Sequence, residues 1–131
     1  MDQKVYSRKF LRIKPDMPMY ATACIVQVGA NKVHTSTMTV RILDISQGGL
    51  RFESVLRLPA DRKIILEMSL VLDLVSFCIQ GIIVHSHSNK NEEFEYGFCF
   101  LEPSSDIRNS LIKMSDRTSA GFKRHIVILR W

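Results

Sequence analysis

The chain has 131 residues, of which 46% are hydrophobic and 24% charged, and its formal net charge is +5. This length fits one domain with a core of its own, and the composition is ordinary for a globular protein. No run approaches the roughly 18 uninterrupted apolar residues of a membrane-spanning helix, and the first ten residues lack the apolar core of a secretory signal. We therefore expect a cytoplasmic protein without membrane insertion.

The first part of the chain is basic and irregular. Residues 1–18 include Pro15 and Pro18 and show no sustained helical or strand period. Five cations lie in the first 14 residues: Lys4, Arg8, Lys9, Arg12 and Lys14. We expect residues 1–18 to form a flexible basic arm, and the positive charge favours anionic partners.

A series of strand-like runs follows, rich in β-branched or aromatic residues and separated by short turns. The expected strands are residues 20–28, 37–45, 50–54, 63–72, 75–87 and 94–101. No long helix intervenes, so the runs predict an antiparallel sheet that closes on itself over residues 19–103 and leaves no exposed edge.

The pattern becomes helical after Glu102-Pro103. Ser104 or Ser105 can cap a helix that carries Asp106 in its first turn and ends near Gly121. Its apolar side comprises Ile107, Leu111, Ile112 and Met114. The sequence does not decide whether the last segment, HIVILRW, is helix or strand. Residues 104–131 are thus expected to form a C-terminal helix and tail.

The cysteines and histidines give no sign of a metal site. Cys24, Cys78 and Cys99 are far apart in apolar runs, so we expect buried, reduced thiols. His85 and His87 share one face of an expected strand, but no third ligand lies at a suitable spacing. Since no catalytic triad, Cys-His pair or paired carboxylates are evident either, we expect neither a metal nor an enzyme.

Two short patterns contain residues suited to a nucleotide. Arg8 and Arg12 are four positions apart in the arm, and Asp44, Ser46 and Gly49 form Asp-x-Ser-x-x-Gly at a strand-to-strand turn. A guanidinium fits phosphate oxygens or the O6/N7 edge of guanine. A carboxylate accepts from the N–H groups of guanine's pairing edge, a hydroxyl adds a donor or acceptor, and glycine permits close approach. Together the patterns predict a guanine-nucleotide site.

Three neighbours of these patterns are secondary candidates. Lys9 can help to attract phosphate, and Gly48 lies within the second pattern. Arg51 follows the turn and can face either the ligand or the solvent.

With both patterns in this order around β-like runs, the chain resembles the PilZ family of cyclic di-GMP receptors. The family's RxxxR corresponds to Arg8 and Arg12, and its (D/N)xSxxG corresponds to Asp44, Ser46 and Gly49. The segments GGLRFES, QGIIVHS and EYGFCFLEPSSDIRNSLIKM resemble the family's later strands and closing helix, so the similarity covers roughly residues 6 to 115. The resemblance implies a mainly all-β fold, a six-stranded antiparallel β-barrel with a C-terminal α-helix.

The resemblance also implies a function. Arg8 and Arg12 would bind the phosphates and the guanine Hoogsteen edge of cyclic di-GMP, while Asp44, Ser46 and Gly49 would hold a guanine from the barrel side. Binding would close the arm onto the barrel and signal to an unidentified effector protein in a bacterial cytoplasm. Many family members carry a further arginine where this chain has Ser7, so the ligand stoichiometry stays open.

Two other functions stay open as alternatives. The first is a PilZ-like adaptor that binds no ligand and acts through protein contacts alone, which the presence of all five site residues disfavours. The second is a barrel that binds single-stranded nucleic acid through exposed aromatic residues. The aromatic content of 8%, mostly within apolar runs, disfavours it.

Overall fold

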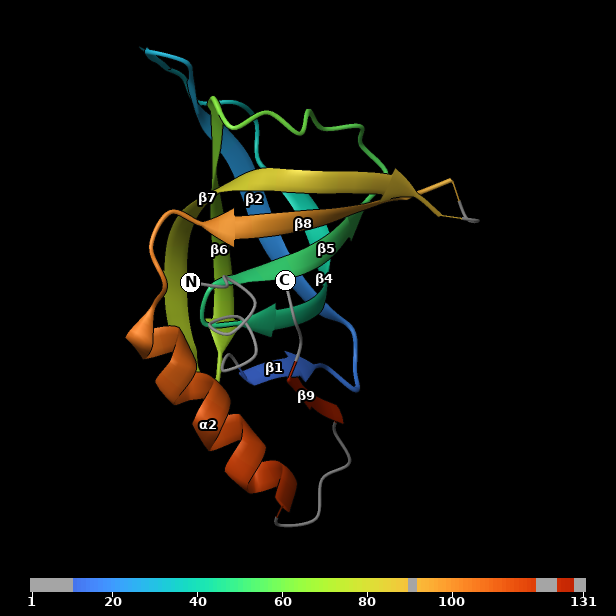
Figure 1. Ribbon diagram of the computed structural model, residues 1–131, viewed down its shortest axis with the longest axis vertical. Coiled ribbons are helices and arrows are strands. Elements are labelled where there is room, and N and C mark those ends of the chain that lie inside the picture. The colour runs from blue at the N-terminus through green and yellow to red at the C-terminus, as the bar shows by residue number, and fades with distance from the viewer. Residues whose placement is uncertain (1–10, 90–91, 120–124, 129–131) are drawn as a thin grey trace, which may run out of the picture.

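The computed structural model describes residues 11–89, 92–119 and 125–128, which are mostly strands (Figure 1). The elements in chain order are β1 (Leu11–Lys14), β2 (Met19–Val28), β3 (Asn31–Lys32), β4 (Met38–Ser46), β5 (Gly49–Ser54), β6 (Ile64–Leu72), β7 (Val75–Ser88), β8 (Phe94–Phe100), α2 (Ser105–Ser119) and β9 (His125–Ile128).

Six of these strands form a closed antiparallel barrel. Their order is β2-β6-β7-β8-β5-β4, and pairing between β2 and β4 closes the ring. Strand β3 extends the sheet beside β2, while β1 and β9 extend it beside β4. Helix α2 runs along one end of the barrel and packs against β1, β4 and β6 (Figure 1). The predicted barrel with a C-terminal helix is confirmed.

Alternate residues of the strands fill the barrel with large apolar side chains. Phe52, Tyr96 and Phe98 are each at most 1% exposed. The rings of Phe52 and Tyr96 stack with their centroids 5.1 Å apart, and Phe98 meets Phe52 edge-on at 6.3 Å. The Tyr96 hydroxyl donates to the carbonyl of Leu56 and accepts from the backbone N–H of Leu58, both at 2.7 Å. The inward residues of β5 and β8 therefore form one aromatic core, in which the Tyr96 hydroxyl has both a hydrogen-bond donor and an acceptor as partners.

Helix α2 begins as the sequence predicts. The Ser104 hydroxyl accepts a hydrogen bond from the backbone N–H of Ile107 at 3.1 Å, so Ser104 rather than Ser105 is the cap. Ile107, Leu111 and Met114 then enter the core. This apolar face holds the helix against the barrel end.

One segment differs from the prediction made from the sequence, and the structure assigns another that the sequence left undecided. Residues 11–14 were expected within an irregular arm, but they form β1, which pairs with β4 and buries Ile13 completely. Four residues are too few to show a strand period. Part of the C-terminal segment forms β9, which pairs antiparallel with β1. Residues 1–10 lie outside the described part of the chain, so the flexible arm stays a prediction there.

The β6–β7 hairpin and the cysteines add two local facts. Asp73 and Leu74 at the hairpin tip have φ of 51° and 66°, the left-handed region that suits glycine or asparagine better. All three cysteines are free, as expected, but Cys78 is exposed and only Cys24 is buried. Cys78 was expected to be buried because its run is apolar, yet it lies on the outer face of β7.

Candidate functional site

Strands β1, β4 and β5 bring together residues from both sequence patterns. Arg12 on β1 lies opposite Ser46 on β4, and Asp44 lies opposite Arg51 on β5. Arg12 thus reaches Asp44 and Ser46 although they lie 32 and 34 positions later in the chain. The antiparallel pairing of β1 with β4 is what positions these side chains.

A buried carboxylate between two guanidinium groups is the centre of this site. Arg12 Nη1 donates to Asp44 Oδ1 at 2.5 Å, and Arg51 Nε donates to Asp44 Oδ2 at 2.6 Å. Asp44 is fully buried and Arg12 is 2% exposed, whereas Arg51 is 33% exposed. Burial lowers the pKa of the Arg12 guanidinium, while the hydrogen bond and the charge of Asp44 raise it. Asp44 is therefore held from a buried side by Arg12 and from a solvent-facing side by Arg51.

Ser46 stabilises the turn between β4 and β5 through hydrogen bonds of its hydroxyl. Its hydroxyl donates to the carbonyl of Gly49 at 3.2 Å, accepts from the backbone N–H of Gly48 at 3.3 Å, and accepts from Arg12 Nη2 at 3.3 Å. A serine in such a place stabilises the turn. In this arrangement it also links the turn to the arginine of the first pattern.

The charges continue outward from Arg51. Arg51 Nη1 lies 3.7 Å from Glu95 Oε1 on β8, which lies 3.6 Å from His87 Nε2 on β7. The sequence left open which way Arg51 faces, and the structure places it between Asp44 and Glu95. Glu95 was missed because its place beside Arg51 depends on the β5–β8 register, for which the sequence carries no signal.

The remaining candidate residues are placed as follows. Gly48 and Gly49 lie at the β4–β5 turn, next to Ser46. Arg8 and Lys9 lie outside the described part of the chain. The structure therefore tests the position of only one of the two arginines of the first pattern.

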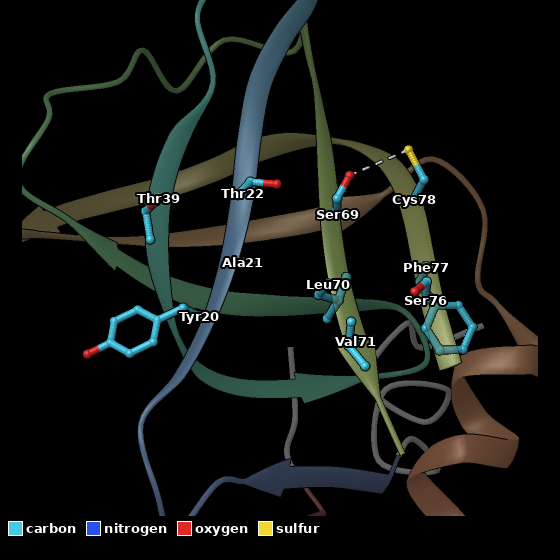
Figure 2. Close-up of a pocket in the computed structure, with 10 residues that line it drawn as sticks. All are labelled: Tyr20, Ala21, Thr22, Thr39, Ser69, Leu70, Val71, Ser76, Phe77 and Cys78. Carbon is cyan, nitrogen blue, oxygen red and sulfur yellow. Dashed lines mark hydrogen bonds between the residues drawn. The ribbon is translucent and has the colours of Figure 1, made fainter. Parts of the chain in front are cut away.

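A groove of about 430 Å³ lies elsewhere, on the outer face of β2, β6 and β7 (Figure 2). Thr22, Ser69 and Cys78 lie across these three strands, and the Ser69 hydroxyl donates to Cys78 Sγ at 3.8 Å (Figure 2). Partial desolvation raises the pKa of the Cys78 thiol, although the side chain is exposed. None of the predicted site residues lines this groove.

Within the described ranges, no group of three or more His, Cys, Asp or Glu side chains lies close enough to hold a metal ion. The helix in the described part of the chain is not long and apolar enough to cross a membrane.

Comparison with known proteins identifies structures of the same fold. The chain is similar to the Bacillus subtilis inhibitor of motility, MotI/DgrA, with a TM-score of 0.62 and 12% identity over 88% of this chain and 53% of that one. It is also similar to the PilZ domain of YcgR from Escherichia coli with c-di-GMP, with a TM-score of 0.55 and 18% identity over 85% of this chain and 92% of that one. The K. pneumonia MrkH–c-di-GMP complex gives a TM-score of 0.54 and 12% identity over 86% and 52%.

At these identities the structural likeness shows the fold alone. The chain spans about half the length of MotI/DgrA and of MrkH. None of the curated proteins matches the chain. The model of the PilZ domain, however, matches residues 6–117, which is most of the sequence. The chain therefore belongs to the PilZ domain family.

Proposed function

We propose that this chain is a cyclic di-GMP receptor that passes the signal to an effector protein. The observation that carries the proposal is the meeting of Arg12 with Asp44 and Ser46, at 2.5 and 3.3 Å, in a PilZ domain. PilZ domains are binding or adaptor modules rather than enzymes. Two of the similar structures, the YcgR PilZ domain and MrkH, contain c-di-GMP.

The groups around Asp44 suit a guanine nucleotide. A carboxylate has about four acceptor positions, and Arg12 and Arg51 each use one of them. Donors of guanine's pairing edge can use the others. Because Asp44 is buried, a base reaches it only after a side chain moves. Arg51 is the exposed one of the two arginines and has Glu95 as a second acceptor, so we expect Arg51 to move.

The proposed signalling step involves Arg8, the first arginine of the RxxxR pattern. Arg8 precedes β1 by a few residues, and we propose that its guanidinium binds the ligand phosphates while Arg12 stays at Asp44. Lys9 would add positive charge beside it. Ligand binding would close residues 1–10 onto the barrel and change the surface that an effector protein contacts. The bacterial and cytoplasmic setting expected from the sequence belongs to the same proposal.

Calorimetric titration of the purified chain with cyclic di-GMP tests the receptor. We expect micromolar or tighter binding, and no binding of GTP. Arg8→Ala is the informative variant, because Arg12 is buried and its removal would perturb the fold as well. Loss of a charge-assisted hydrogen bond should weaken binding at least about 10-fold.

Arg41→Ala is the matched control. Arg41 is another arginine of the barrel surface, 44% exposed, and it pairs with Glu53 rather than with Asp44. Its removal should change the affinity by less than about 2-fold. If the unmodified chain shows no heat with cyclic di-GMP at any concentration, the receptor is refuted and the ligand-independent adaptor becomes the better hypothesis.

A further inference from the structure

The tip of the β6–β7 hairpin carries a leucine that is unfavourable there for two reasons. Leu74 is 95% exposed, the largest fraction among the exposed large hydrophobic residues of the described chain. Its φ of 66° lies in the left-handed region, where a branched aliphatic residue is strained. Neither hydration nor backbone conformation therefore accounts for a leucine at this position. A side chain that is both strained and fully exposed is a candidate for contact with a partner.

Other exposed apolar side chains lie close to this tip. Val71 is exposed near the end of β6, and Val75 is exposed at the start of β7, where it pairs with Leu72. Tyr20 is exposed on β2, the strand that pairs with β6 on its other side. Figure 2 shows Tyr20 and Val71 on these two neighbouring strands. The tip therefore continues into an apolar surface on the outside of the barrel.

The groove of about 430 Å³ on β2, β6 and β7 lies beside this tip (Figure 2). Val71 lines the groove and precedes Leu74 by three positions. Leu70 and Phe77, which pair across β6 and β7, also line it, so the groove can receive an aliphatic side chain. Among the described residues, ten line the groove and none of them is charged. A projecting leucine and an uncharged groove thus lie next to each other on the same two strands.

A second copy of this chain complements both features. When one surface has a projecting side chain and a groove that fits it, a two-fold axis lets each copy insert its projection into the other copy. Charge favours the same partner. The chain has a formal net charge of +5, so two copies repel each other in general, but this groove brings no like charges together when it is covered. An acidic partner, by contrast, would find no cation among the described groove residues.

We propose that the outer face of β2, β6 and β7 is the interface of a two-fold symmetric dimer, in which Leu74 of each copy enters the groove of the other. This face is separate from the candidate nucleotide site, because neither Arg12 nor Asp44 lines the groove. The dimer and the proposed receptor are therefore independent of each other. Few side chains make the contact, so the dimer is weak and dissociates on dilution.

Sedimentation velocity of the full chain tests the dimer. Dilution from about 500 µM to about 5 µM should convert dimer into monomer, as mass action requires. Leu74→Gly should weaken the association at least about 10-fold, because the central apolar contact is lost from both copies. The variant should stay folded, since glycine adopts the left-handed conformation without strain. Val55→Ser is the matched control: Val55 is 72% exposed in the loop at the other end of β6, and the association should change by less than about 2-fold.

Thr22→Arg tests the groove instead of the tip. Thr22 is exposed on β2 and lines the groove, so an arginine there would bury an unpaired charge in each copy and should abolish the dimer. Thermal denaturation of each variant at low concentration verifies that it is folded. A chain that is monomeric even at about 500 µM would overturn the proposal and leave Leu74 to contact with a different protein. A dimer that persists in Leu74→Gly or in Thr22→Arg would also overturn it, since the interface would then lie elsewhere.

Discussion

Removing the carboxylate of Asp44 should destabilise the fold more than removing a partner of any exposed ion pair of the barrel. Asp44 is fully buried and Arg12 is 2% exposed, so Asp44→Ala leaves a buried guanidinium without the carboxylate it binds at 2.5 Å. Breaking a buried pair by removing one partner costs about 3–5 kcal/mol. Arg51 adds little to this cost, because a third of its side chain is exposed and water can solvate it.

Urea denaturation followed by far-ultraviolet circular dichroism at pH 7 measures this difference. The denaturation midpoint should fall with little change in the slope, because the folded barrel still buries the same surface. In thermal denaturation, the same loss lowers Tm by about 10–20 °C for a chain of this size. Since small domains have only about 5–15 kcal/mol of stability, the variant is folded but marginal.

Two further variants separate the buried charge from other causes. Arg41→Ala removes an arginine that is 44% exposed, and its partner Glu53 keeps the hydrogen bond from Asn89, so the loss should be smaller, about 1–2 kcal/mol. The double variant Arg12→Met, Asp44→Leu removes both buried charges and should recover most of the lost stability. An Asp44→Ala variant that loses less than about 1 kcal/mol would refute the reasoning, because the pair would then not be shielded from water.

Three other substitutions test the core and the turns. Burial raises the pKa of Tyr96, so its contribution is complete below the unfolded value of about 10 and is lost as the pH rises through the higher folded value. In urea denaturation from pH 7 to 11, Tyr96→Phe should be less stable by about 1–3 kcal/mol at pH 7, because two backbone groups lose their partner, and should show a smaller alkaline decline. Leu74→Gly should raise the free energy of unfolding by about 1 kcal/mol in thermal denaturation, because Leu74 has φ of 66° and is 95% exposed; a loss would contradict the strain. Gly81→Ala should destabilise by about 1–3 kcal/mol in the same assay, since its Cβ would overlap the Cys99 carbonyl and the Phe98 ring, and a neutral result would show that the barrel can relax there.

The barrel strands were predictable because their side chains alternate between core and solvent. In β8, Tyr96, Phe98 and Phe100 are buried, and the expected strand over residues 94–101 differs from the observed one by a single residue. Strand β1 was not predictable in the same way. Its four residues follow a basic run, and Arg12 is charged, which in a single sequence indicates solvent rather than core.

For the candidate site, the sequence indicated the local turn but not the contacts between residues distant in the chain. The spacing of Asp44, Ser46 and Gly49 pointed to a turn, and this turn is present. That Arg12 is buried against Asp44 depends on the pairing of two strands distant in sequence. The position of His85 depends in addition on an irregularity in the register between Ile83 and His85. A hairpin turn fixes the register of its two strands, but β1 and β4 are not joined by such a turn, and the bulge in β7 depends on its pairing with β8.

The position of β1 between β4 and β9 has a consequence for the order of folding. Hairpins such as β6–β7 and β7–β8 join strands that are neighbours in sequence, whereas Arg12 pairs with Val127, about 115 positions later. Contacts between such distant segments form slowly, because a long loop must close before any contact is gained. During synthesis on the ribosome, β1 therefore waits for nearly the whole described chain before it has both neighbours. We expect the proposed nucleotide site to be among the last parts of the barrel to become ordered, although its first strand is made early.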